Sequence, residues 1–228
     1  MISRLFMPVA LLLCCLVLLA NATTTKSGRG HAAASATVPL EPYLRAQAVV
    51  HAEVNGQPGT FIFDTGEGVS SFSPEFAAKI GCDPWGRISG FRMSGERLDN
   101  KHCDNITFDL SGHKLLAPVV STVDIMKFLG AGVPPVDGSL GLDLFADRTI
   151  TIIPQKAIVF ENASSLAKRI RTGHELPIRM VRDVEGIALS VDGAVRTPKG
   201  LAWMELDKWT LTLDLEHGHA WLGLLSLD

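Results

Sequence analysis

The chain has 228 residues, of which 46% are hydrophobic and 20% are charged, and its formal net charge is −3 at pH 7. A chain of this length holds one domain or two small ones and can bury a sizeable core. The nearly balanced charge argues against nucleic acid or an anionic membrane surface as a partner.

The N-terminus has the pattern of a secretory signal peptide over residues 1–22. Arg4 supplies a positive charge, a leucine-rich apolar run follows over residues 9–19, and residues 20–22 form a small-x-small cleavage site. An uncleaved membrane anchor is the alternative, but the apolar run is short for a full span. We therefore expect an exported protein, periplasmic or secreted, with no stable membrane anchor after signal cleavage. Residues 23–37 contain too few apolar side chains to fold and are predicted to be a linker.

The first predicted folded element is a β-hairpin. Residues 48–54 alternate between apolar and polar side chains, the Asn-Gly pair at 55–56 is the strongest turn signal in the chain, and residues 59–63 form the return strand. That strand runs directly into Asp-Thr-Gly at 64–66. A carboxylate at the end of a buried strand needs hydrogen bonds or a shared proton, because burying a charge is costly. The alternative is a simple strand-end turn, in which Asp and Gly are common.

A short helix ending in glycine is predicted over residues 73–81, and a glycine-punctuated stretch follows at 86–95. Cys82 and Cys103 flank this stretch, and an isolated cysteine pair in an exported protein usually forms a disulfide. The bond would close a loop of about twenty residues and would stabilise the fold by roughly 3 kcal/mol. No histidines at ligand spacing surround the two cysteines, so we predict no metal site.

A second distinctive motif occupies residues 136–145, where Asp-Gly-Ser-Leu-Gly precedes a short apolar run that contains one acid. Hairpins are predicted on either side of it, over residues 105–116 and 149–160. A short helix is predicted over residues 142–146. These elements place the motif between two β-rich segments.

Together, the two motifs resemble those of the retropepsin-like (retroviral-type) aspartic peptidases, as in bacterial-type exported members, over roughly residues 45–162. In that family a strand ending in Asp-Thr-Gly carries the catalytic carboxylate, and a later Asp-Gly-x-Leu-Gly segment crosses behind the catalytic loop. The resemblance implies an all-β fold with one closed acid-protease β-barrel lobe over residues 38–163 and one or two short helices. It also implies a peptide or protein substrate and no metal or organic cofactor.

The resemblance assigns roles to individual residues. Asp64 would be catalytic, and its loop would be supported by Thr65, Gly66 and Ser70. The crossing segment would contribute Asp137, Gly138, Leu140 and Gly141. A flap closing over the substrate would contain Gly90, Phe91, Met93 and Gly95, and an ordinary surface hairpin is the alternative to a flap. Glu67 stands where the family usually has Ala or Ser, and a third acid there would raise the proton demand of the site.

The C-terminal part faintly repeats the first hairpin. After a predicted connector at residues 164–174, residues 186–193 have the pattern of a strand followed by an Asx-Gly turn. A strand over 201–207 then ends in Asp207, but Lys-Trp-Thr follows it instead of Thr-Gly. We therefore predict a short, β-rich, degenerate second half-lobe over residues 175–228, with Asp207 as a candidate second acid.

Peptide hydrolysis at such a site needs two carboxylates that share one proton around a water molecule. One chain offers a single Asp-Thr-Gly, so we expect a symmetric homodimer in which Asp64 of each protomer forms the dyad. Two alternatives stay open. One is an inactive domain that acts as a peptide-binding or structural module. The other is an unrelated exported β-domain, which would be indicated if residues 61–66 and 136–141 did not meet in space. A serine hydrolase is poorly supported because the sequence contains no Gly-x-Ser-x-Gly motif.

Overall fold

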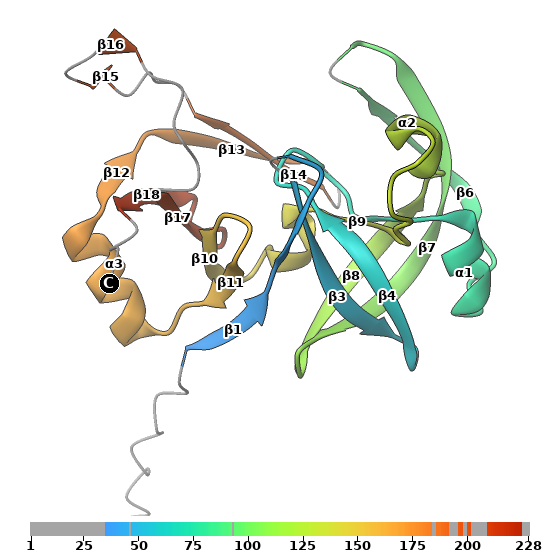
Figure 1. The fold of residues 1–228 in the computed structure, drawn as a ribbon, viewed down its shortest axis with the longest axis horizontal. Coiled ribbons are helices and arrows are strands. Elements are labelled where there is room, and N and C mark those ends of the chain that lie inside the picture. Colours follow the sequence, from blue (N-terminus) through green and yellow to red (C-terminus); the bar gives the residue numbers. More distant parts are fainter. Residues whose placement is uncertain are drawn as a thin grey trace, which may run out of the picture. The chain divides into compact units, whose positions relative to one another are not determined.

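Strands make up most of the structure, a computed structural model that describes residues 35–45, 47–92, 94–183, 186–191, 196–197, 200–201 and 209–224 (Figure 1). The predicted all-β class is confirmed. The predicted signal peptide, Met93 and Asp207 lie outside the described residues. Within the described part of the chain, no helix is long and apolar enough to cross a membrane.

The larger sheet closes into a ring, as expected for the first lobe. Its order is β2-β3-β4-β9-β5-β8-β7-β6, and a further pairing of β3 with β7, at Glu53–Asp109 and Val54–Phe108, closes the ring. The strands are β2 (Glu41–Tyr43), β3 (Gln47–Val54), β4 (Gln57–Phe63), β5 (Ser71–Phe72), β6 (Trp85–Phe91), β7 (Arg97–Leu110), β8 (His113–Thr122) and β9 (Gly138–Leu140). The turns at residues 55–56 and 111–112 fall where the sequence predicts them.

Aromatic side chains fill the interior of the ring. The centre of the Phe61 aromatic ring, on β4, lies 5.2 Å from the ring centre of Phe76 and 5.9 Å from that of Phe108. All three side chains are buried. Phe76 comes from α1 (Pro74–Lys79), which begins at the N-cap Ser73, whose hydroxyl accepts a hydrogen bond from the Phe76 amide. Burial of such aromatic side chains is a major source of stability, so the strand that leads to Asp64 is anchored in the core.

Two further short helices belong to this lobe. α2 (Met126–Leu129) lies within a stretch of otherwise irregular backbone after β8. The helix predicted at 142–146 is a 3-10 helix, η1 (Leu142–Phe145), and all four of its residues are buried.

A second sheet has six strands in the order β1-β11-β10-β17-β18-β12. Its strands are β1 (Ala36–Pro39), β10 (Thr149–Ile153), β11 (Ala157–Phe160), β12 (His174–Leu176), β17 (Trp209–Asp214) and β18 (His219–Leu224). The last two residues of the predicted linker, Ala36 and Thr37, belong to β1, where they pair with Phe160 and Val159 of β11. Its Val38 is only 1% exposed, so this strand is part of the core.

The six strands are arranged symmetrically about one pair of threonines. Thr151 of β10 lies opposite Thr212 of β17, and their buried hydroxyls are 2.7 Å apart. Outward from this pair, β11 and then β1 follow on one side, while β18 and then β12 follow on the other. The C-terminal part therefore supplies a counterpart to each strand that the first part contributes to this sheet.

The remaining C-terminal elements are α3 (Ala163–Thr172), the hairpin of β13 (Ile178–Asp183) and β14 (Gly186–Val191), and the short strands β15 (Arg196–Thr197) and β16 (Gly200–Leu201). α3 begins at Asn162, whose side chain accepts hydrogen bonds from the amides of Ser164 and Ser165. The predicted strand that ends in Asp207 lies outside the described residues, apart from Leu201 in β16.

Candidate active site

The Asp64 loop begins where β4 ends at Phe63. The Asp64 amide donates a hydrogen bond to the Leu140 carbonyl at 3.0 Å, which fixes the start of the loop to β9. The Gly66 amide donates to Asp64 Oδ1 at 2.8 Å. Asp64, Thr65 and Gly66 are exposed, so the carboxylate is held by the backbone and is open to a substrate.

The crossing strand β9 lies between β4 and β5. It runs parallel to β4, with Phe61 opposite Gly138 and Phe63 opposite Leu140, and antiparallel to β5. Residues 61–66 and 136–141 therefore lie side by side, which the aspartic peptidase hypothesis requires. An unrelated β-domain would have been indicated if these two segments did not meet, so the contact argues against that alternative.

Asp137 fastens the beginning of the crossing strand. Its Oδ2 accepts a hydrogen bond from the Thr60 amide at 2.8 Å, while its own amide donates to the Thr60 carbonyl at 2.7 Å. Its carbonyl accepts from the Ser73 amide at 2.7 Å. Asp137 thus connects β4 to the start of α1, and it does not act as a partner acid for Asp64.

Ser70 and Asp143 form a buried hydrogen-bonded pair behind the loop. Ser70 donates from its amide to Asp143 Oδ2 and from its hydroxyl to Asp143 Oδ1, both at 2.9 Å. The same hydroxyl accepts from the Gly141 amide at 3.0 Å. Burial raises the pKa of Asp143 to about 6, although the hydrogen bonds from Ser70 act in the opposite direction. Our sequence analysis did not identify Asp143; the signal was the single acid in the apolar run after Gly141.

Glu67 is the second acid behind the loop. Burial raises its pKa to about 8, hydrogen bonding by Ser139 and Ser71 lowers it, and the charges of Asp64 and Asp143 raise it further. Its Oε2 is buried and has no hydrogen-bond partner among the described residues. The sequence marks Glu67 as a departure from the family pattern but does not show that its carboxyl is enclosed.

The flap candidates lie on the hairpin of β6 and β7. Phe91 and Arg97 pair at its end, the Gly95 amide donates to the Arg92 carbonyl at 2.8 Å, and Gly90 lies one residue before Phe91 on β6. Phe91 is 73% exposed. The Arg92 guanidinium lies 4.4 Å from the centre of the Phe128 ring, which links the tip of the hairpin to α2.

The disulfide between Cys82 and Cys103 is present, with the two Cα atoms 6.2 Å apart. It joins the segment after α1 to β7, in which Cys103 pairs with Val120 of β8. The bond therefore anchors the hairpin of β6 and β7 to the segment that follows α1.

The C-terminal hairpin contacts the Asp64 loop directly. The amide of Ile187 on β14 donates to the Gly68 carbonyl at 2.9 Å, and the Ile187 side chain is buried. Arg182 on β13 donates to the carbonyls of Ala146 and Leu215. The hairpin of β13 and β14, which lies in the predicted half-lobe, is therefore hydrogen-bonded to the Asp64 loop and to the residue that follows η1.

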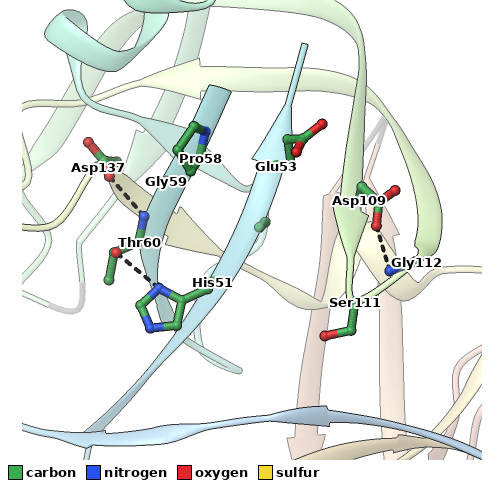
Figure 2. A pocket seen from close by; sticks show the side chains of 10 residues that line it. His51, Glu53, Pro58, Gly59, Thr60, Asp109, Ser111, Gly112 and Asp137 are labelled. Carbon is green, nitrogen blue, oxygen red and sulfur yellow. Dashed lines mark hydrogen bonds between the residues drawn. The ribbon is translucent and has the colours of Figure 1, made fainter. Parts of the chain in front are cut away.

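One large hollow lies away from Asp64, on the outer side of β3 and β4. Its volume is about 720 Å³, and its lining includes His51, Glu53, Thr60, Asp109 and Asp137 (Figure 2). Thr60 binds both Asp137 and His51, and Asp109 Oδ1 accepts from the Gly112 amide. Because these polar groups serve strand pairing and turns, we assign the hollow no catalytic role. No cluster of three or more potential metal ligands occurs among the described residues.

Comparisons with a family model and with solved structures show what the chain is similar to. Residues 50–144 match a family model described as "Aspartyl protease". Among solved structures, the chain is similar to a retropepsin-like aspartic protease from Rickettsia conorii, with 15% identity, a TM-score of 0.38, and coverage of 55% of this chain and 91% of that one. No curated protein matches. The segment that is similar to the aspartyl protease family contains both the Asp64 loop and the crossing strand.

Proposed function

We propose that this protein is an exported aspartic endopeptidase that hydrolyses peptide bonds through a water molecule held by Asp64 and a second carboxylate. The observation that carries this proposal is the Asp64 loop itself. An exposed carboxylate stands at the end of a core strand, is oriented by the Gly66 amide at 2.8 Å, and is backed by the crossing strand.

The chemistry follows from two carboxyl groups that share one proton. The ionised carboxylate takes a proton from the water as its oxygen attacks the carbonyl carbon of the peptide bond. The protonated carboxyl donates a hydrogen bond to the carbonyl oxygen and stabilises the negative charge that develops there. Proton return to the leaving nitrogen completes the cleavage, so no metal or cofactor enters the scheme.

The second carboxylate has to come from outside the described neighbourhood of Asp64. Asp143 is buried behind the loop, and Glu67 is half-buried with its Oε2 enclosed, so we assign neither of them to the dyad. We propose Asp64 of a second protomer as the partner, because the chain has one Asp-Thr-Gly. The contact between Ile187 and Gly68 constrains such a dimer, since the C-terminal hairpin already occupies one side of the loop. Asp207 of the same chain is the competing source.

Export is supported by the N-terminal signal pattern and by the disulfide between Cys82 and Cys103, because structural disulfides persist in oxidising compartments. The proposal therefore places the peptidase in the periplasm or outside the cell.

The test is cleavage of an unfolded protein by the chain from Thr23 onward, from acid to neutral pH, in wild type and in Asp64→Asn. The exposed Asp83, changed to Asn, is the matched control. We expect Asp64→Asn to lose at least 10³-fold in kcat/KM, because the dyad cannot form without it. A dimer predicts that specific activity falls on dilution. An intramolecular pair predicts no such fall and the loss of activity in Asp207→Asn. A folded wild type as inert as Asp64→Asn would favour a non-catalytic peptide-binding module.

A further inference from the structure

We propose that Glu67, as a neutral carboxylic acid, is a positioning residue that fastens the Asp64 loop to the strands crossing behind it. This inference rests on the proposed function for its catalytic consequence, but not for its structural one.

The backbone of Glu67 contacts both Asp64 and Gly141, which follows the end of β9. Its amide donates to the Asp64 carbonyl at 3.3 Å, which closes the turn of the loop. A Cβ on Gly141 would lie 2.5 Å from the Glu67 carbonyl oxygen, so only a glycine lets the chain pass this close. The position of Glu67 is therefore fixed relative to both the catalytic acid and the crossing strand.

The Glu67 side chain reaches two serines that lie opposite each other on neighbouring strands. Ser71 belongs to β5 and Ser139 to β9; both are buried, and their hydroxyl oxygens are 2.7 Å apart. Both serines act on the Glu67 carboxyl as hydrogen-bonding partners. The carboxyl thus joins the loop to the two strands at the point where they cross.

Enclosure of the carboxyl favours the neutral acid. One of the two serine hydroxyl hydrogens is used between the serines, which leaves one to donate to Glu67. Hydrogen bonding by the serines favours the ionised form, but removal of the carboxyl from water is the larger effect and favours the protonated form. An ionised Glu67 would place a charge in a buried site where Oε2 has no hydrogen-bond partner among the described residues. Both charged groups that act on it, Asp64 and Asp143, are acids, and both oppose ionisation.

The neutral state also protects the chemistry at Asp64. A negative charge on Glu67 would repel the charge of Asp64 and would disturb the single proton that the dyad has to share. The raised pKa of Glu67, about 8, agrees with a proton that stays in place under acidic and neutral conditions. Glu67 touches neither substrate nor water in this scheme, so its contribution is to orientation.

The first experiment needs no activity. Carbon-13 labelling of glutamate side chains should reveal one carboxyl that titrates near pH 8, far from the solvent value near 4.5. That signal should disappear in Glu67→Gln and persist in Glu53→Gln, which alters an exposed glutamate on β3. Folding favours the protonated form, so stability is lost as pH rises from 4.5 to 8. We expect wild type to melt roughly 10 °C lower at pH 8 than at pH 5, relative to Glu67→Gln over the same interval.

The second experiment measures cleavage at pH 5. Glu67→Gln, a neutral isostere, should keep kcat within about threefold of wild type, whereas Glu67→Ala should lose roughly tenfold or more in kcat with little change in KM. If wild type does not cleave, the proposed function fails, while the titration and melting curves still decide the role of Glu67. A Glu67 signal that titrates near 4.5, with parallel melting curves for wild type and Glu67→Gln, would overturn the inference.

Discussion

Gly138→Ala tests whether the crossing of β9 against β5 holds the site together. A Cβ at this position would lie 2.0 Å from the Ser71 carbonyl oxygen, 2.9 Å from the Ser71 carbonyl carbon and 3.0 Å from the Phe72 Cα. All three atoms belong to backbone, so no side chain can rotate away to make room. Gly138 also has a φ of +155°, which residues with a side chain rarely adopt.

The expected cost is the sum of two effects. Forcing extra volume into a tightly packed site costs about 1–3 kcal/mol, and holding alanine in a rare backbone conformation costs about 1–3 kcal/mol more. We therefore expect Gly138→Ala to lower the free energy of unfolding by about 2–6 kcal/mol, a large share of the roughly 5–15 kcal/mol by which a typical domain is stable.

Gly112→Ala is the matched control. Gly112 also has a positive φ, +88°, but a Cβ there would meet nothing within 4 Å. Gly112→Ala should therefore lower the free energy of unfolding only through the unfavourable backbone conformation, by about 1–2 kcal/mol. Both free energies can be measured by urea unfolding followed by circular dichroism. Equal costs for the two variants would refute the argument that backbone contact, and not φ alone, requires glycine in the crossing strand.

Two further predictions concern the groups behind and beside the loop. Burial raises the pKa of Asp143 to about 6 from 3.8, so the folded state favours its proton, and about 2 kcal/mol of stability should be lost as pH rises from 4 to 6. Asp143→Asn should flatten this part of the stability–pH curve, and an unchanged slope in urea unfolding would contradict the assignment. Replacing both Cys82 and Cys103 by Ser should lower the free energy of unfolding by roughly 3 kcal/mol, since the bond spans 21 positions. A loss below about 1 kcal/mol, measured in the same way, would show that the disulfide does not restrain the unfolded chain as the loop-entropy model assumes.

Local signals in the sequence were sufficient for the hairpins. The alternation over β3, the Asn-Gly turn and the apolar return strand β4 are all encoded within about sixteen neighbouring residues, and the structure has them where predicted. The same holds for β10 and β11, and for α1 with its Ser73 cap. The Asp64 loop and the crossing segment were found because both are short, contiguous motifs.

Pairings between distant segments were not visible in the sequence. β17 joins β10 across sixty-one positions through Thr151 and Thr212, and nothing local to either strand specifies that register. The enclosure of the Glu67 carboxyl involves β5 and β9, which contribute Ser71 and Ser139. A charged residue in a loop ordinarily indicates solvent, so its role follows only from the three-dimensional contact.

The loop after Asp64 is held at three successive places by three different parts of the chain. Glu67 is bound by the serines of β5 and β9, Gly68 by the amide of Ile187, and Ser70 by Asp143. Two of these restraints come from the ring of strands and η1, but the third comes from the C-terminal hairpin. The conformation of the Asp64 loop therefore depends on a contact with the C-terminal part of the chain, although that part has no Asp-Thr-Gly of its own.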